Sequence, residues 1–318
     1  MDFLKRQNPW AVSLAFALIL VGGYKALLAP PSDFPSGSIV VIARGSSAPQ
    51  VSLQLLDANI VSNSPVLQSI LRVWGKSGSV QAGAYRFEKP QNVFTVANRL
   101  ATGAYGFPPV RITFPEGTTV REMAAQIADS LPEISSSDFL KEAQPYEGYL
   151  FPDTYLFPPS ASATSVVATM RENFNIKIST LLDDIQGSGH SLGDVVILAS
   201  LVEKEARTTA SRRAVAGILW NRLKLGMPLQ VDAVFGYIFN RDTYSPSFED
   251  LKVVSPYNTY LHTGLPPGPI DNPGLDSLDA VVHPTKTDYL YYLTGSDNLM
   301  HYATTYAGHL ANQRKYLR

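Results

Sequence analysis

The sequence predicts an α+β protein in three parts: a membrane anchor, a small region of short strands and helices, and a larger, mainly helical domain with long proline- and glycine-rich loops. Three observations lead to this prediction. An uncharged run lies near the N-terminus, two segments between residues 38 and 140 alternate like strands before they switch to helical periodicity, and helix-period segments fill residues 141–318. A chain of 318 residues has the length of one large or two modest domains.

The composition excludes several classes of function. The 26 basic and 27 acidic side chains give a formal net charge of -1, which lacks the basic footprint of a nucleic-acid binder. The chain has no cysteine, so it holds no disulfide, thiolate zinc site, iron–sulfur cluster or cysteine nucleophile. Its five histidines are too widely spaced for a local H-E-x-x-H zinc motif, and the sequence has neither a phosphate-binding glycine loop nor a G-x-S-x-G elbow.

Residues 1–29 are expected to form a cytoplasmic stub and a transmembrane anchor. Lys5 and Arg6 precede an uncharged run that ends at Tyr24 and approaches the roughly 20 residues needed to cross a bilayer, and the basic end would stay in the cytoplasm. A cleaved signal peptide is the alternative, but leucines occupy the positions where its cleavage site would need small residues. Residues 30–37 contain three prolines and predict a short extended linker, so the rest of the chain would lie outside the membrane.

Residues 38–140 contain two similar strand–turn–helix segments. The first runs from a strand at Val40 through a turn at Gly45, and the second from a strand at Ile112 through a turn at Gly117; in each, a hydroxyl side chain follows as the expected helix N-cap. Between them the pattern predicts another strand and another helix, over residues 83–87 and 92–100. The strand, Gly-Thr-Thr turn and amphipathic helix resemble LysM-type sugar-binding modules, although an ordinary packing domain has the same pattern.

Residues 195–207 lack proline and glycine and predict a helix that carries two glutamates in different environments. At about 100° per residue its apolar side chains share one face, and Glu205 falls within about 20° of the centre of that face, at position i+7 from Leu198. Glu203 points away from this face and is expected to pair with Arg207, at position i+4, in solvent. The two carboxyl groups are therefore expected to have different roles.

The apolar surroundings expected for Glu205 suggest acid chemistry. A carboxyl group on an apolar face is costly to ionise, so burial should raise its pKa and favour the protonated form. A glutamate that keeps its proton near neutral pH is suited to act as a general acid, as in glycoside cleavage. The alternative is a glutamate that ends a buried helix and turns outward or meets Arg212 or Arg213.

Polar side chains on stiff turns follow this helix. They lie in residues 229–232, 255–260 and 263–274, and the high proline and glycine content of the last segment excludes a helix or a central strand there. Tyrosines and asparagines beside prolines are typical of the flat, hydrogen-bonding walls of a carbohydrate groove. A purely structural connector is the alternative for these segments.

Several motifs arrive in one order in the second half of the chain. They are Glu147–Tyr155, Ala199–Ala206, Asn221–Leu223, Leu229–Asp232, Tyr257–Tyr260, Gly264–Ile270, Asn272–Gly274, His283–Pro284 and Tyr289–Tyr291. Together they resemble the MltG (YceG-like) family of endolytic murein transglycosylases. The resemblance implies the family's architecture, with the anchor over residues 1–29, a LysM-like region over 38–140 and the transglycosylase domain over 141–318.

The resemblance implies that Glu205 is the catalytic acid, which agrees with its place on the helix. The candidate substrate-binding residues lie in the polar segments that follow: Gln230, Asp232, Tyr257, Asn258 and Tyr260. The sequence departs from the family pattern in two places. Residues 233–235 stand where a small hydroxyl residue usually follows the Gln-x-Asp motif, and Gly308 stands where an acid is expected.

The implied reaction is non-hydrolytic cleavage of the β-1,4 bond between N-acetylmuramic acid and N-acetylglucosamine in peptidoglycan. One glutamate acts first as acid and then as base to close a 1,6-anhydro ring, so no metal or cofactor is expected. The alternatives are a lysozyme-like hydrolase with Asp232 as its second acid, and a non-catalytic scaffold that holds glycan strands.

The expected partners follow from the anchor and the resemblance. They are peptidoglycan strands, the cytoplasmic membrane and, through the resemblance, peptidoglycan synthases (penicillin-binding proteins); no nucleic acid is expected. The protein would be a single-pass protein of the cytoplasmic (inner) membrane with its catalytic domain on the periplasmic side.

Overall fold

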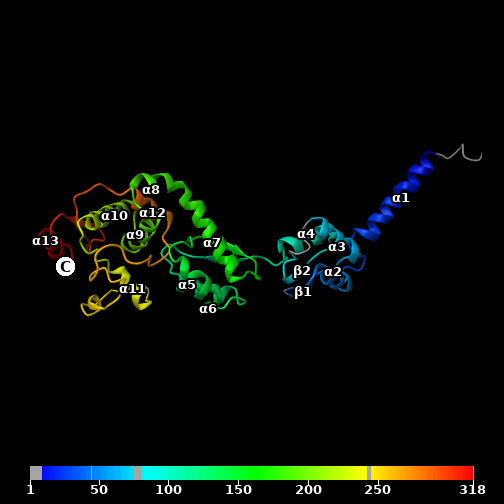
Figure 1. Ribbon diagram of the computed structural model, residues 1–318, viewed down its shortest axis with the longest axis horizontal. Coiled ribbons are helices and arrows are strands. Elements are labelled where there is room, and N and C mark those ends of the chain that lie inside the picture. The colour runs from blue at the N-terminus through cyan, green and yellow to red at the C-terminus, as the bar shows by residue number, and fades with distance from the viewer. Residues whose placement is uncertain (1–8, 44, 75–79, 242–244, 318) are drawn as a thin grey trace, which may run out of the picture. The chain divides into compact units, whose positions relative to one another are not determined.

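The computed structural model describes residues 9–43, 45–74, 80–241 and 245–317 (Figure 1). The chain forms two compact units, which are Met1–Pro109 with Pro158–Ser160, and Val110–Phe157 with Ala161–Arg318. Lys5 and Arg6, the basic residues of the expected cytoplasmic stub, lie outside the described residues. The sequence predicts a domain boundary at residue 140, whereas the compact units divide after Pro109.

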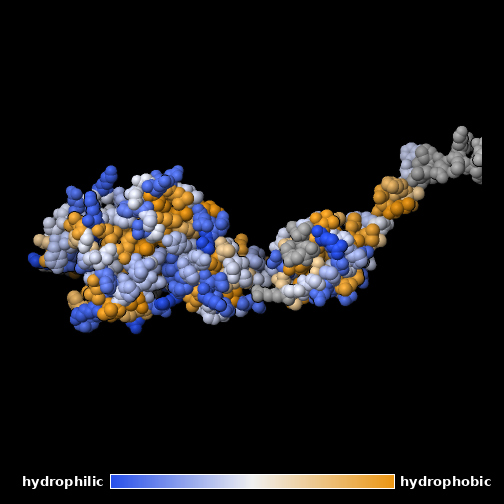
Figure 2. All heavy atoms as spheres, viewed as in Figure 1, coloured by the Kyte–Doolittle hydropathy of each residue, from blue (hydrophilic) through white to orange (hydrophobic). Residues whose placement is uncertain are grey.

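Helix α1 (Pro9–Leu27) occupies the uncharged run near the N-terminus. Many of its apolar side chains are exposed and form the hydrophobic surface visible in Figure 2: Trp10, Leu14, Phe16, Leu18, Ile19, Leu20, Val21 and Tyr24. Across the part of the chain that is described, no helix combines the length and the apolar character needed to cross a membrane.

The segment expected to be an extended linker, residues 30–37, packs within the first unit. The ring of Phe34 meets the ring of Phe87 edge-on, with centroids 6.4 Å apart. The backbone N–H of Gly37 donates to the carbonyl oxygen of Phe87 at 2.7 Å. This segment therefore contributes an aromatic side chain to the edge of the core.

In the described residues, two antiparallel strands and three helices follow in the first unit. Strand β1 (Ser38–Ile42) pairs with β2 (Gly83–Phe87). The helices are α2 (Ala48–Asp57), α3 (Ser64–Val73) and α4 (Val93–Thr102). Alternate residues of β1 are buried, as expected of a strand that covers a core on one face. They pack with apolar side chains of all three helices.

The second unit begins with another strand pair. Strand β3 (Val110–Thr113) pairs antiparallel with β4 (Thr154–Phe157). Between them lie α5 (Val120–Ser130), α6 (Ser136–Ala143) and the short 3-10 helix η1 (Gln144–Tyr146). The second strand–turn–helix segment therefore belongs to this unit, because β3 finds its partner strand beyond residue 140.

Helix α9 (Leu192–Glu205) lies among the helices of the second unit (Figure 1) and packs against α10, α11 and α12. Seven of its residues are buried: Val195, Val196, Leu198, Ala199, Ser200, Leu201 and Val202. A helix that is apolar on nearly all sides has to lie in a core. The other helices of this part are α7 (Ala163–Ile178), η2 (Ser179–Leu181), α8 (Leu182–Ser188), α10 (Thr209–Lys224), α11 (Ala233–Phe239), η3 (Asp250–Lys252) and α12 (Leu275–Val282).

The C-terminal segment adds strands β5 (Tyr291–Thr294) and β6 (Met300–Ala303), which pair antiparallel, and helix α13 (Tyr306–Tyr316). Residues 263–274 form no helix or strand, as their proline and glycine content predicts, apart from isolated bridges that join Thr263 to Pro228 and Asn272 to Thr118. The stiff loop is thus joined to two other parts of the same unit.

Candidate active site

The end of α9 places Glu203 and Glu205 in different surroundings. The helix stops at Glu205, because Ala206 already has extended torsions (φ -138°, ψ 142°). The side chain of Glu203 is 6% exposed, and one of its oxygens lies 2.6 Å from Nη2 of Arg212. Its other oxygen accepts a hydrogen bond from the N–H of Gly274 at 3.0 Å.

The predicted solvent-exposed pair between Glu203 and Arg207 is therefore wrong. Arg207 is exposed, whereas Arg212 comes from the first turn of α10, which packs on α9 and brings its guanidinium onto Glu203. The sequence also leaves open an ion pair between Glu205 and Arg212. The guanidinium instead bridges Glu203 and Asp276, both at 2.6 Å.

Glu205 receives neutral hydrogen-bond donors. The hydroxyl of Tyr292 donates to its Oε2 at 3.0 Å, and the backbone N–H of Ala233 donates to the same carboxyl group. Burial raises the pKa of Glu205 to about 7; the two hydrogen bonds oppose this shift and the negative charge of nearby Asp232 adds to it. At neutral pH a large fraction of this group is therefore protonated, as its place on the apolar face predicts.

Asp232 and Tyr260 form a second polar pair near Glu205. The hydroxyl of Tyr260 donates to Oδ1 of Asp232 at 2.5 Å. Burial, together with the Asp232 carboxylate, raises the pKa of Tyr260, so the hydroxyl remains a donor. The tyrosine ring is supported by Phe235 of α11, with centroids 5.9 Å apart. The structure thus brings together three residues that the sequence singled out: Glu205, Asp232 and Tyr260.

Gln230 lies on the turn that leads to Asp232. Its backbone has a positive φ of 53°, and its N–H donates to the carbonyl oxygen of Thr259 at 3.1 Å. The side chain is exposed, and its Oε1 accepts from Nη1 of the buried Arg222 at 3.3 Å. Arg222 also donates to the carbonyl oxygens of Leu229 (2.7 Å) and Leu290 (2.6 Å), so it fixes this turn against the start of β5.

Asn258 and Tyr257 belong to the loop that carries Tyr260. Asn258 is fully buried; its amide donates to the carbonyl oxygens of Leu251 (3.0 Å) and Val253 (2.8 Å), and its Oδ1 accepts from the N–H of Tyr260 (2.9 Å). Both amide donors are used inside the loop, so Asn258 holds the loop that carries Tyr260. The partly buried ring of Tyr257 packs on Tyr237 of α11, with centroids 5.0 Å apart.

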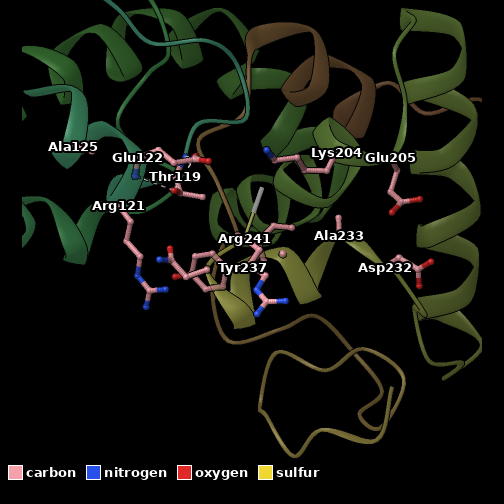
Figure 3. Close-up of a pocket in the computed structure, with 13 residues that line it drawn as sticks. Thr119, Arg121, Glu122, Ala125, Lys204, Glu205, Asp232, Ala233, Tyr237 and Arg241 are labelled. Carbon is pink, nitrogen blue, oxygen red and sulfur yellow. Dashed lines mark hydrogen bonds between the residues drawn. The ribbon is translucent and has the colours of Figure 1, made fainter. Parts of the chain in front are cut away.

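A cleft of about 540 Å³ opens beside the end of α9 (Figure 3). It is lined by residues of α5, α9, α11 and neighbouring loops, which are Thr119, Arg121, Glu122, Ala125, Lys204, Glu205, Asp232, Ala233, Gly236, Tyr237, Asn240, Arg241 and Ile270. Figure 3 shows Glu205 and Asp232 together at one side of the cleft and Arg121 at the other. The cleft therefore presents a proton-bearing carboxyl group to any molecule bound in it.

The first turn of α5 is fixed in the cleft wall by Asn272 and Glu147. The amide of Asn272 donates to the carbonyl oxygen of Thr118 (2.9 Å) and to Oε1 of Glu147 (3.1 Å). The same glutamate oxygen accepts from the N–H of Val120 at 2.9 Å. Burial raises the pKa of Glu147 to about 7, and its other oxygen has no hydrogen-bond partner among the described residues. A carboxyl group that is partly protonated at neutral pH is thus built into the support of the cleft.

Several cleft residues did not emerge from the sequence. Arg121 and Tyr237 line the cleft but lie outside the motifs that carry the family resemblance. Tyr292, the partner of Glu205, directly follows the Tyr289–Tyr291 motif, the one signal that points near it. Glu147 and Asn272 were noticed as motif residues without a role. Within the described ranges, no three histidine, aspartate or glutamate side chains are grouped so that they could hold a metal ion.

Comparison with known proteins gives consistent matches over most of the chain. Residues 40–315 match the model of the YceG-like family. An endolytic murein transglycosylase of Bacillus subtilis (strain 168) is 31% identical over 331 residues, which cover 94% of this chain and 91% of that protein. A protein of the same name from Streptococcus pneumoniae serotype 2 (strain D39) is 26% identical over 345 residues; the match covers 93% of this chain but 62% of that longer protein.

A solved structure gives a similar result. The crystal structure of a YceG-like protein from Listeria monocytogenes aligns with this chain at a TM-score of 0.60 and 27% sequence identity. The alignment covers 87% of this chain and 99% of the Listeria chain. The mixed helices and small sheets described above are therefore similar in arrangement to a known YceG-like fold.

Proposed function

The chain belongs to the YceG-like family, and from this premise we propose that it is an endolytic murein transglycosylase in which Glu205 serves as acid and then as base. The name carried by its relatives in Bacillus subtilis and Streptococcus pneumoniae supports the activity. The observation that carries the assignment to Glu205 is its carboxyl group, which lines the cleft with a pKa raised to about 7 by burial.

In the first step, the protonated Glu205 donates its proton to the oxygen that joins muramic acid C1 to N-acetylglucosamine. The bond between C1 and this oxygen breaks, the N-acetylglucosamine end leaves as an alcohol, and positive charge develops at C1. A pKa near the working pH suits this role, because a useful fraction of the acid is present and its conjugate base is still able to accept a proton.

In the second step, the Glu205 carboxylate removes the proton from the C6 hydroxyl of the same muramyl residue. The C6 oxygen attacks C1 and closes the 1,6-anhydro ring, and Glu205 is protonated again. The Tyr292 hydroxyl and the Ala233 N–H support the carboxylate between the two steps, since both donate to it. Asp232, held by Tyr260, supplies negative charge for the positive charge at C1.

Purified protein incubated with peptidoglycan sacculi tests this proposal. We expect products that end in 1,6-anhydro-muramic acid, lighter by one water than the reducing ends that hydrolysis leaves. Glu205→Gln should lower the rate by about 10²- to 10⁴-fold, the usual contribution of general acid–base catalysis. Unchanged cleavage by this variant would remove Glu205 from the mechanism.

A two-carboxylate hydrolase is the second candidate, and the charge of Asp232 next to Glu205 is the observation that favours it. Such an enzyme would activate water and release reducing muramic acid. The same product analysis separates the two reactions. A parent protein that cleaves nothing but still binds strands would instead support the non-catalytic scaffold.

The proposal extends to location and partners. The exposed apolar side chains of α1 support attachment of the N-terminus to the cytoplasmic membrane, with the catalytic unit on the periplasmic side next to its peptidoglycan substrate. The paired strands β1 and β2 with two helices between them support a LysM-like, glycan-binding role for the first unit. An association with peptidoglycan synthases rests on the family resemblance.

A further inference from the structure

The cleft that Glu205 lines also carries basic side chains. Arg121 of α5, Lys204 of α9 and Arg241 after α11 all line it. We propose that these residues form a basic arm that binds the carboxylates of the peptide stems on muramyl residues, so that the enzyme prefers strands that still carry their stems. The inference rests on the proposed function, because it names the part of the substrate that the same cleft recognises.

Arg121 has a defined orientation in the cleft wall. It lies in the first turn of α5, and its guanidinium lies over the ring of Tyr237, 5.9 Å from the centroid. Tyr237 is supported in turn by Tyr257, whose ring lies 5.0 Å away. A guanidinium placed over an aromatic ring loses less freedom when it binds, and its planar fork matches the two oxygens of a carboxylate.

The backbone under Arg121 is fixed as well. Thr119 caps α5, and the bonds from Asn272 and Glu147 hold the residues on either side of this cap. Gly117 has a φ of 75°, and a β-carbon there would lie 3.4 Å from the side chain of Lys204, so the turn passes close over the lysine. The first turn of α5 also carries the positive end of the helix dipole.

Glu122 and Asp232, two acidic residues that line the cleft, have hydrogen-bond partners of their own. Oε2 of Glu122 accepts from the N–H (2.7 Å) and the hydroxyl (2.9 Å) of Thr119 and so serves the helix cap. Asp232 lies with Glu205 at the far side and is bonded to Tyr260. Neither of these bonds uses Arg121, whose guanidinium lies over the Tyr237 ring in the cleft.

The chemistry of the substrate indicates which anion this is. The sugar rings of the glycan are uncharged, so they give no reason for cations in the cleft. Each stem, however, carries free carboxylates and is attached to the muramyl residue whose C1 and C6 must lie at Glu205. A stem-binding arm therefore has to lie in the same cleft as the acid, which is where Arg121, Lys204 and Arg241 are found.

The first test compares kcat/KM on strands that carry stems with kcat/KM on strands stripped by an amidase, which keep the lactyl carboxylate alone. We expect the parent to prefer stem-bearing strands. Arg121→Gln should reduce this preference by about tenfold through a higher KM, the effect of losing one charged hydrogen bond. The matched control is Arg111→Gln, an exposed arginine on β3 of the same unit that does not line the cleft, and it should leave the preference unchanged.

The second test measures binding without catalysis. Muramyl tripeptide and its carboxyl-amidated form are titrated into the full-length parent, Arg121→Gln and Arg111→Gln. The parent and the control should bind the free-acid form more tightly, with a difference that shrinks at high salt, and Arg121→Gln should lose most of that difference.

The outcomes separate this inference from the proposed function. Equal kcat/KM on the two kinds of strand, or equal losses in Arg121→Gln and Arg111→Gln, would overturn the basic arm while the transglycosylase assignment stands. An equal loss on stripped and stem-bearing strands would assign Arg121 to the lactyl carboxylate and would also overturn it. Selective binding of the free-acid peptide by a parent that cleaves no strand would support the arm and refute the proposed activity.

Discussion

Glu203 and Glu205 both lie at the C-terminal end of α9, but their carboxyl groups have different surroundings. Glu203 faces α10 and has a guanidinium at 2.6 Å, with a second carboxylate sharing that cation. Glu205 faces the cleft and receives a hydroxyl and a backbone N–H, and burial raises its pKa to about 7. The comparison teaches that the hydrogen-bond partners decide the role of a carboxyl group at the end of α9. Glu203 is paired with a guanidinium and joins helices, whereas Glu205 has neutral donors and faces the cleft.

The largest expected effect comes from exchanging the two glutamates for glutamine one at a time. Glu205→Gln should lower cleavage of sacculi by about 10²- to 10⁴-fold with little loss of stability, since it removes a costly buried acid. Glu203→Gln should keep the parent's rate of cleavage but unfold at a lower concentration of denaturant. Rate measurements beside urea unfolding curves check both. If the two variants had similar cleavage rates and similar unfolding curves, Glu203 and Glu205 would not have the different roles assigned to them.

Substitution of Arg212 tests the structural role of its ion pair with Glu203 directly. Arg212→Met should cost about 3–5 kcal/mol of unfolding free energy, because it leaves Glu203 buried without its partner. Arg213→Met is the control: its carboxylate partner is Asp279, at 2.7 Å, and the arginine side chain is 43% exposed, so the cost should stay within about 1 kcal/mol. Chemical denaturation of both variants measures the difference. If the two variants lost the same unfolding free energy, burial of the ion pair between Arg212 and Glu203 would contribute little to stability.

Glu147 extends the comparison to a third carboxyl group. Its pKa of about 7 in the folded protein exceeds the ordinary value of 4.5, so the folded state binds the proton more tightly than the unfolded chain. The resulting stability is fully present below pH 4.5 and is lost as the pH rises through 7. Glu147→Gln should remove this loss and gain about 2–3 kcal/mol over the parent at about pH 8.

Unfolding curves at acid and alkaline pH measure the effect of Glu147→Gln. The exposed Glu133→Gln is the control and should follow the parent at both pH values. A glutamine variant that is no more stable than the parent at alkaline pH would show that Glu147 is not a buried neutral acid.

The smallest effect is expected at Tyr292, whose hydroxyl bonds to the carboxyl group of Glu205. This bond lowers the pKa of Glu205, so Tyr292→Phe should raise it and move the high-pH limb of the kcat/KM profile upward by about one pH unit, the worth of one hydrogen bond to a charged group. Tyr302→Phe, its partner position on β6, is the control and should leave the profile in place. A profile that does not move in Tyr292→Phe would mean that this hydroxyl does not tune the acid.

Local pattern was enough to predict several elements. The predicted strand over residues 83–87 matches β2, and the stiff segment over 263–274 has neither helix nor strand. The helix predicted over 195–207 is observed as Leu192–Glu205. These features depend on hydrophobic periodicity, on chain-breaking residues and on caps, all of which act within a few residues of each other.

Other features depended on partners far along the chain. The strand at Ile112 resembled the one at Val40, yet it pairs with β4 and lies in the other compact unit. Asn258 looked suited to glycan binding by residue type, but its amide is used inside its own loop. A sequence pattern gives the type of each residue. It does not show which donor or acceptor will form a hydrogen bond with that residue in the folded chain.

The sequence by itself determined that Glu205 lies on the apolar face of a helix and that rigid polar loops follow it, because side-chain direction on a helix and the torsions of proline and glycine are local properties. The tertiary structure alone decided that Arg212 pairs with Glu203, that Tyr292 reaches Glu205, and that α5 forms the far wall of the cleft. Those outcomes depend on the packing of α5, α10 and β5, since hydrogen bonds and ion pairs form only between groups that the packing of the whole unit brings within about 3 Å.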